Sequence, residues 1–109
     1  MPPSTDIFLV ITTVPNIDTA RSLAEKLVNE RAAACVNIMA PCISTYLWQG
    51  KLETAEEHTL LIKTSRSRYQ RLEQLIQEVH PYELPEIIGI PVEQGLPAYL
   101  AWVAAETKS

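Results

Sequence analysis

The stretch AACVNIMAPCISTYLWQGKLETAEEHTLLIKTS, residues 33–65, decides the fold. It contains two long extended segments that meet at Gln49-Gly50, where glycine supplies the positive φ that a tight hairpin turn requires. Each extended segment of about 14 residues reaches ~46 Å, which is longer than the body of a domain of this size. Tyr46, Leu47 and Trp48 lie near the tip, where an isolated arm would expose them to water. We therefore predict a projecting β-hairpin that another chain covers.

The segment before the hairpin predicts one strand and one helix. Residues 6–14, DIFLVITTV, are β-branched and apolar at both parities, as expected for a strand that is covered on both faces. From residue 17 to about residue 31 the apolar residues follow helical spacing. Asn16 is the expected N-cap of this helix.

The segment after the hairpin predicts a second helix, a short strand and a last helix. Helical spacing returns over residues 66–80, where Ser67 and Gln70 have the form of a capping box. Residues 86–92, EIIGIPV, predict a short strand, and Pro97 opens the terminal helix.

This order of elements predicts an α+β fold, a ferredoxin-like βαββαβ sandwich with an additional C-terminal helix. Right-handed crossovers place the strands, numbered along the chain, in an antiparallel sheet of order 4-1-3-2. Proline cannot donate a ladder hydrogen bond and is confined to edge strands. Pro41 and Pro91 fall in the second and fourth strands, which are the edges of this sheet. We interpret residues 1–109 as one such domain.

One face of the predicted sheet lacks a cover from within the chain. Both main helices of this fold lie on the same face, yet strand 6–14 carries Ile7, Leu9 and Ile11 on one side and Phe8 and Val10 on the other. The terminal helix could cover part of the second face. We expect another subunit to cover the rest, which predicts a homo-oligomer.

Composition and charge exclude several classes of protein. The net charge of −4 opposes binding to nucleic acid or to anionic membranes, which require a basic surface. RNA-recognition domains share the βαββαβ order but need aromatic residues on central strands, and residues 56–64, EEHTLLIKT, have none. No segment approaches the ~20 apolar residues of a membrane span. Cys35 and Cys42 fit free thiols of a cytoplasmic protein.

Residues 78–86, EVHPYELPE, are either a stiff turn or one wall of a binding site. In the first interpretation the prolines rigidify the turn, Tyr82 packs and His80 caps the preceding helix. In the second, His80 and Glu83 offer an imidazole and a carboxylate to a divalent cation. A firm site needs a third group, such as Cys35, Lys63 as the partner of an anion, or a group from the neighbouring subunit.

Other candidate residues also have two interpretations. Cys35 is either a buried structural thiol or a soft ligand for copper. Lys63 is either a surface residue or the partner of an anionic group on a ligand. Trp48 fits an anchor in an inter-subunit groove.

The same residues permit an enzymatic alternative. Cys35 and His80 could form a nucleophile and its base, and His80 and Glu83 a general acid/base pair. The sequence has no glycine-rich phosphate loop, no GxSxG elbow and no HExxH motif. We therefore expect a binding protein and not an enzyme.

The succession TTVPN, ERAAACVNI, STYLWQGKLE, LLIKT, HPYELPEI and YLAW resembles the CutA family of divalent-cation tolerance proteins. The resemblance covers residues 7–103. It implies a ferredoxin-like protomer in a homotrimer similar to the PII signalling proteins, with clefts between the subunits. Metal-binding relatives carry a thiol in the first strand and a second histidine before HPYE, where this sequence has Thr12 and Val79.

The resemblance and the residues together predict a function in metal homeostasis or PII-like signalling. A divalent metal of the copper type, or a small polar ligand, would bind in the inter-subunit clefts, and no cofactor is obligatory. His80, Glu83 and Cys35 are the candidate metal ligands. The other candidate ligand-binding residues are Lys63, Tyr82, Glu86 and, from an adjacent hairpin, Trp48.

Overall fold

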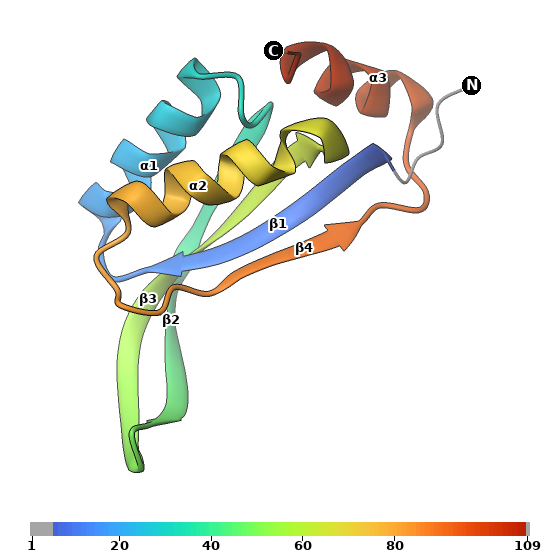
Figure 1. Ribbon diagram of the computed structural model, residues 1–109. Helices are drawn as coiled ribbons and strands as arrows, with labels where there is room; N and C mark the ends of the chain where they lie inside the picture. The colour runs from blue at the N-terminus through green and yellow to red at the C-terminus, as the bar shows by residue number, and fades with distance from the viewer. Residues whose placement is uncertain (1–5, 109) are drawn as a thin grey trace.

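The computed structural model describes residues 6–108, so residues 1–5 and 109 of the expected domain lie outside the described part (Figure 1). The helices and strands are β1 Ile7–Val14, α1 Ile17–Asn29, β2 Cys35–Trp48, β3 Lys51–Ser65, α2 Tyr69–Val79, β4 Ile87–Pro91 and α3 Pro97–Glu106. The four strands form one antiparallel sheet of order β2-β3-β1-β4. This is the expected 4-1-3-2 order read from the opposite edge, and it confirms the α+β fold.

Local chemistry sets both ends of α1. The side chain of Asn16 accepts a hydrogen bond of 2.8 Å from the amide of Thr19, which confirms the expected N-cap. The helix ends at Asn29, two residues earlier than expected, and Arg31 follows in the left-handed region with a φ of 58°. Arg68 then donates hydrogen bonds to the carbonyl oxygens of Glu30 and Arg31.

The expected capping box at the start of α2 is wrong. Residues Arg66–Arg68 form a 3-10 turn, and α2 begins at Tyr69 with no side-chain cap. The hydroxyl of Ser67 lies 3.2 Å from the hydroxyl of Ser65, so it faces the end of β3 and not the helix. The tight turn has replaced the first helical turn that a capping box would close.

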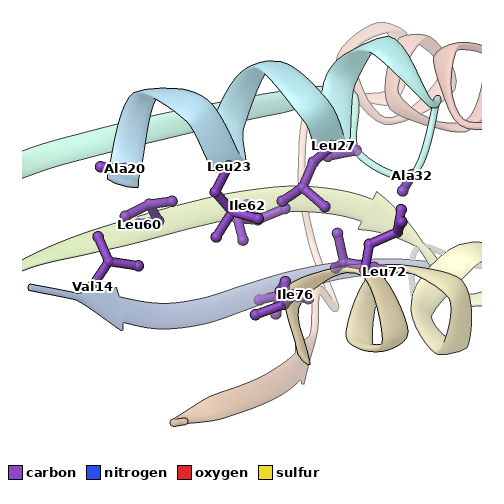
Figure 2. Packing of buried hydrophobic residues seen from close by; sticks show 12 residues of the cluster. Val14, Ala20, Leu23, Leu27, Ala32, Leu60, Ile62, Leu72 and Ile76 are labelled. Carbon is purple, nitrogen blue, oxygen red and sulfur yellow. The ribbon is translucent and has the colours of Figure 1, made fainter. Parts of the chain in front are cut away.

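The main core lies between the sheet and the helices α1 and α2, which cover the same face (Figure 1). Figure 2 shows side chains from both helices meeting those of β1 and β3. Each fully buried leucine or isoleucine contributes roughly 1.5–3 kcal/mol relative to an exposed one. The largest fully buried apolar side chains of this core are Val10, Val14, Leu23, Leu27, Leu60, Ile62, Leu72, Leu75 and Ile76.

The opposite face of the sheet is covered only at one end. There Val103 of α3 packs with Ile7 and Ala34 in a second, smaller core. Further along, Leu9 and Ile11 stay half-buried, and their β4 partners Ile90 and Ile88 are 42% and 48% exposed. The terminal helix therefore covers part of the second face, as expected, and leaves an apolar strip open.

The hairpin of β2 and β3 projects beyond the body of the molecule (Figure 1). Gln49 and Gly50 both have positive φ, 53° and 85°, as a two-residue hairpin turn of type I′ requires. The molecule measures 49 × 25 × 23 Å, and the hairpin accounts for its elongation. We call the distal part of this hairpin, residues 41–58, the arm.

A β-bulge in β2 separates the arm from the body of the sheet. Ile38 lies opposite Leu60, but Pro41 lies opposite His58, so β2 contains one residue more than β3 between these pairs. His58 stabilises the bulge, because its Nδ1 lies 3.0 Å from the carbonyl oxygen of Met39.

The extra residue exchanges the two faces of β2. In the body, even-numbered residues such as Ile38 lie on the face that the helices cover. In the arm, Tyr46 and Trp48 lie opposite Glu53 and Lys51, on the face that the helices leave open. The apolar residues Ile43, Leu47 and Leu52 occupy the other face of the arm and are 71–76% exposed.

Among residues 6–108, no helix has the length and apolar content needed to cross a bilayer.

Candidate functional site

The connector between α2 and β4, residues 80–86, is fixed to β1 by His80. Its Nδ1 accepts a hydrogen bond of 3.1 Å from the backbone amide of Tyr82. The proton of the neutral ring therefore lies on Nε2, which donates to the carbonyl oxygen of Thr13 at 2.7 Å. The imidazole thus binds the end of β1, and both of its nitrogens are occupied. The backbone amide of His80 donates to the carbonyl oxygen of Ile76 at 2.9 Å, so His80 also caps α2.

Tyr82 fixes the connector to the base of the arm. Its hydroxyl donates a 2.7 Å hydrogen bond to Oε2 of Glu57 on β3, and its ring packs against His80 at 4.8 Å between centroids. Burial, with Glu57 nearby, raises the pKa of Tyr82 well above its ordinary value of 10.0. The phenol therefore stays a neutral donor to the carboxylate. Figure 1 shows the connector passing beside the point where β1 ends.

A cavity of about 640 Å³ lies between the connector and the arm. Aromatic rings and carboxylates from both segments line it, together with smaller polar and apolar groups. The rings belong to Tyr46, Trp48 and Tyr82, and the carboxylates to Glu53, Glu57, Glu83 and Glu86. The β-bulge is essential to this arrangement because it turns Tyr46 and Trp48 toward the face that carries Glu57.

The structure brings together four of the candidate residues from the sequence. Trp48, Tyr82, Glu83 and Glu86 all line the cavity. Trp48 comes from the same chain as the connector, whereas we had expected it to come from a neighbouring hairpin. One protomer therefore builds both walls of this cavity.

Cys35 and Lys63 lie at a different place on the sheet. They are opposite each other in the ladder, and the side chains of both contact Oδ1 of Asn37. Thr13, which binds His80, pairs with Thr59 four residues along β3 from Lys63, a separation of about 13 Å. Burial, and then the nearby Cys35, raise the pKa of Tyr99 on α3. Within one copy, neither Cys35 nor Lys63 reaches the connector.

The described residues of one copy do not assemble a metal site. Within residues 6–108, no three side chains of histidine, cysteine, aspartate or glutamate lie close enough to hold a metal ion. Both nitrogens of His80 are already used by backbone groups. The metal set of His80, Glu83 and Cys35 stays a prediction that would require ligands from another copy and a rearranged imidazole.

Sequence reasoning missed Glu57, Glu53 and Tyr46 as residues that line the cavity. The signal for Glu57 was weak, because it shares its strand parity with Leu61 and also with the polar Thr59 and Lys63, so the pattern of β3 does not single it out. The role of Tyr46 depends on the β-bulge, which the pattern of β2 did not reveal.

The sequence model of the CutA1 divalent ion tolerance protein family matches residues 8–106. The chain belongs to the CutA1 family. "Protein CutA" of Mus musculus is 44% identical to this chain over 97 residues, which are 89% of this chain and 55% of the mouse protein. The chain thus spans about half the length of this relative. The "Divalent-cation tolerance protein CutA" of Thermus thermophilus is 40% identical over 91% of the chain and 96% of its own length.

Solved structures of CutA1 proteins have the same fold. The divalent cation tolerance protein (Cut A1) of Thermus thermophilus superposes with a TM-score of 0.91 at 39% identity, covering 94% of this chain and 99% of that one. CutA of Xylella fastidiosa superposes with a TM-score of 0.92 at 42% identity, with the same coverage. The family description points to tolerance of divalent cations and not to catalysis.

Proposed function

We propose that this CutA1-family chain functions as a homotrimer that binds a small ligand or a divalent metal in clefts between its copies. Its role would be metal homeostasis or PII-like signalling by ligand binding, without catalysis. The observation that carries the proposal is a pair of exposed apolar surfaces on opposite faces of one sheet.

The first surface, which we call the sheet surface, is the apolar strip on the open face of the body. It consists of Leu9, Ile11, Leu61, Ile88 and Ile90. The second, the arm surface, consists of Ile43, Leu47 and Leu52. Exposed apolar patches of this kind mark interfaces in soluble proteins. The adjoining helix α3 has no charged residue before Glu106, which also favours burial by another chain.

Two different surfaces favour a ring. A twofold dimer buries the same patch on both copies, whereas contact between the arm surface of one copy and the sheet surface of the next is heterologous and gives a ring when the rotation between copies closes. The resemblance of the sequence to the CutA family supports a ring of three. In such a ring the cavity at the base of each arm lies beside an interface and becomes part of a cleft.

The contacts of the candidate residues favour binding over catalysis. A nucleophile and its base must lie within hydrogen-bond reach, and Cys35 and His80 are separated by about 13 Å along the sheet. His80 cannot act as a base toward Glu83 or a substrate while its Nδ1 accepts the amide of Tyr82. We also propose a cytoplasmic location, with which the free thiols of Cys35 and Cys42 are compatible.

The oligomer is tested by placing a charge on the sheet surface. Ile90→Asp should dissociate the trimer, because it buries a carboxylate without a partner in the interface. Val28→Asp is the matched control, since Val28 on α1 is equally exposed, at 42%, but lies outside both surfaces. Light scattering should show a trimer for the wild type and Val28→Asp and smaller species for Ile90→Asp. A folded wild-type monomer at micromolar concentration would refute the proposal.

Metal binding is tested separately by titration calorimetry with copper. The His80→Ala variant should bind copper more weakly, because the proposed copper site includes His80 and is completed by a neighbouring copy. Identical isotherms for the wild type and His80→Ala would remove His80 from the ligand set.

A further inference from the structure

Glu57 is a buried carboxylate without a cationic partner. Its side chain is only 6% exposed, and its one hydrogen bond comes from the neutral hydroxyl of Tyr82 to Oε2. The second oxygen has no partner among residues 6–108, although Glu57 lines the cavity. Burying an ionised carboxylate is costly unless a cation or several donors compensate it. The cavity therefore holds a carboxylate that no ion pair among residues 6–108 neutralises.

No lysine or arginine of the described residues lines the cavity. Lys51 lies opposite Trp48 in the ladder, but it forms no ion pair with a carboxylate among residues 6–108. The cavity carries Glu53, Glu83 and Glu86 in addition to Glu57. The field inside it is therefore strongly negative and attracts cations.

The lining distinguishes an organic cation from a bare metal ion. No three acidic, histidine or cysteine side chains of the described residues converge closely enough to coordinate a metal. The rings of Tyr46, Trp48 and Tyr82 line the cavity instead, and aromatic rings attract ammonium and guanidinium groups. A volume of about 640 Å³ suits a small organic molecule and far exceeds that of one ion.

We propose that the cavity binds a small organic cation, an alkylammonium group that contacts the aromatic rings and pairs with Glu57. This inference deepens the proposed function by naming the ligand class of the cleft. The binding groups all come from one chain, so the site itself does not require the neighbouring copies. The other source of such a cation is a lysine of a second copy, and the experiment below separates the two.

Choline chloride is a suitable probe, and 3,3-dimethylbutanol is its neutral counterpart of nearly the same shape. Saturation transfer from the full-length protein to the methyl protons of each compound measures binding. The wild type should bind choline about tenfold more tightly than the neutral alcohol, because only choline gains the charge and cation–π contributions. Sodium chloride at matched ionic strength should not compete beyond ordinary screening.

Two variants locate the site. Glu57→Gln should weaken choline binding about tenfold with little effect on the alcohol. Glu56→Gln is the matched control, because Glu56 is the next residue on β3, faces the other side of the arm and does not line the cavity. Trp48→Leu is a second test that keeps an apolar side chain and removes the aromatic face. Circular dichroism checks that each variant is folded.

The outcomes are distinct. Equal affinity for choline and the neutral alcohol, or equal weakening by Glu57→Gln and Glu56→Gln, would overturn the inference. A trimer that dissociates only in Glu57→Gln would show that a lysine of a second copy occupies the cavity, which also overturns it. Light scattering on the same samples separates the two proposals. A wild-type trimer that does not bind choline refutes only the cation site, and a monomer that binds choline refutes only the trimer.

Discussion

The Nε2 atom of His80 lies 2.7 Å from the carbonyl oxygen of Thr13. This contact joins residues 67 positions apart and fixes the connector against the C-terminal end of strand β1. The same ring accepts the amide of Tyr82, which aims the Tyr82 hydroxyl at Glu57. His80 is thereby the residue that positions one wall of the cavity.

His80→Ala should therefore destabilise the protein by about 2–3 kcal/mol, because it leaves two backbone groups without partners. Urea denaturation followed by circular dichroism measures the loss. His58→Ala is the control: this other histidine makes one hydrogen bond, to Met39, and should cost about half as much. An equal loss for the two variants would contradict the positioning role of His80.

Tyr82→Phe should cost about 1.5–3 kcal/mol at neutral pH, since it removes the hydroxyl that donates to the buried carboxylate of Glu57. The pKa of Tyr82 is raised by burial and by Glu57, so the folded state favours the protonated phenol. That stabilisation is complete below about pH 10, the ordinary pKa of tyrosine, and is lost as the pH rises toward the folded-state pKa. Denaturation series should converge for wild type and variant above pH 10. Parallel series would argue against the raised pKa.

Arg68→Ala should destabilise the protein by about 1–2 kcal/mol, because Arg68 donates to two carbonyl groups just after α1. Arg68 therefore links the start of α2 to the end of α1. Arg21 on the exposed side of α1 provides the control, and Arg21→Ala should change the midpoint little. Thermal melts of the two variants give the comparison directly.

Deletion of Ala40 should remove the β-bulge and return Tyr46 and Trp48 to the opposite face of the arm. In a Trp102→Phe background, Trp48 is the only tryptophan and reports this change by its emission spectrum. We expect a shift of the emission maximum and loss of choline binding. Ala40→Gly keeps the residue count and should preserve both. An unchanged spectrum after the deletion would mean that the turn at Gln49 and Gly50 has absorbed the missing residue.

The sequence predicted those parts of the fold that depend on local chemistry. Asn16 capped its helix, and the prolines of β2 and β4 lie on the sheet edges as their missing amide requires. The prediction of the start of α2 was wrong, because Ser67 fits both a capping box and a 3-10 turn, and it forms part of the 3-10 turn.

The candidate site could be predicted only in part, since it depends on a register that a single strand does not encode. The connector residues Tyr82, Glu83 and Glu86 were identifiable from a motif dense in functional groups. The contribution of Tyr46 follows from the β-bulge, and that becomes visible only when β2 is paired with β3. The separation of Cys35 from His80 is likewise a property of the paired sheet.

The projecting arm also bears on how the stability of this protein should be measured. Its side chains Ile43, Leu47 and Leu52 bury little surface within their own chain, so in the proposed trimer most of their hydrophobic free energy is released only when copies meet. Part of the folding free energy then follows mass action, and the melting temperature should rise with protein concentration. Dilution should therefore lower the stability of such a molecule, and a free energy of unfolding quoted without the protein concentration is incomplete.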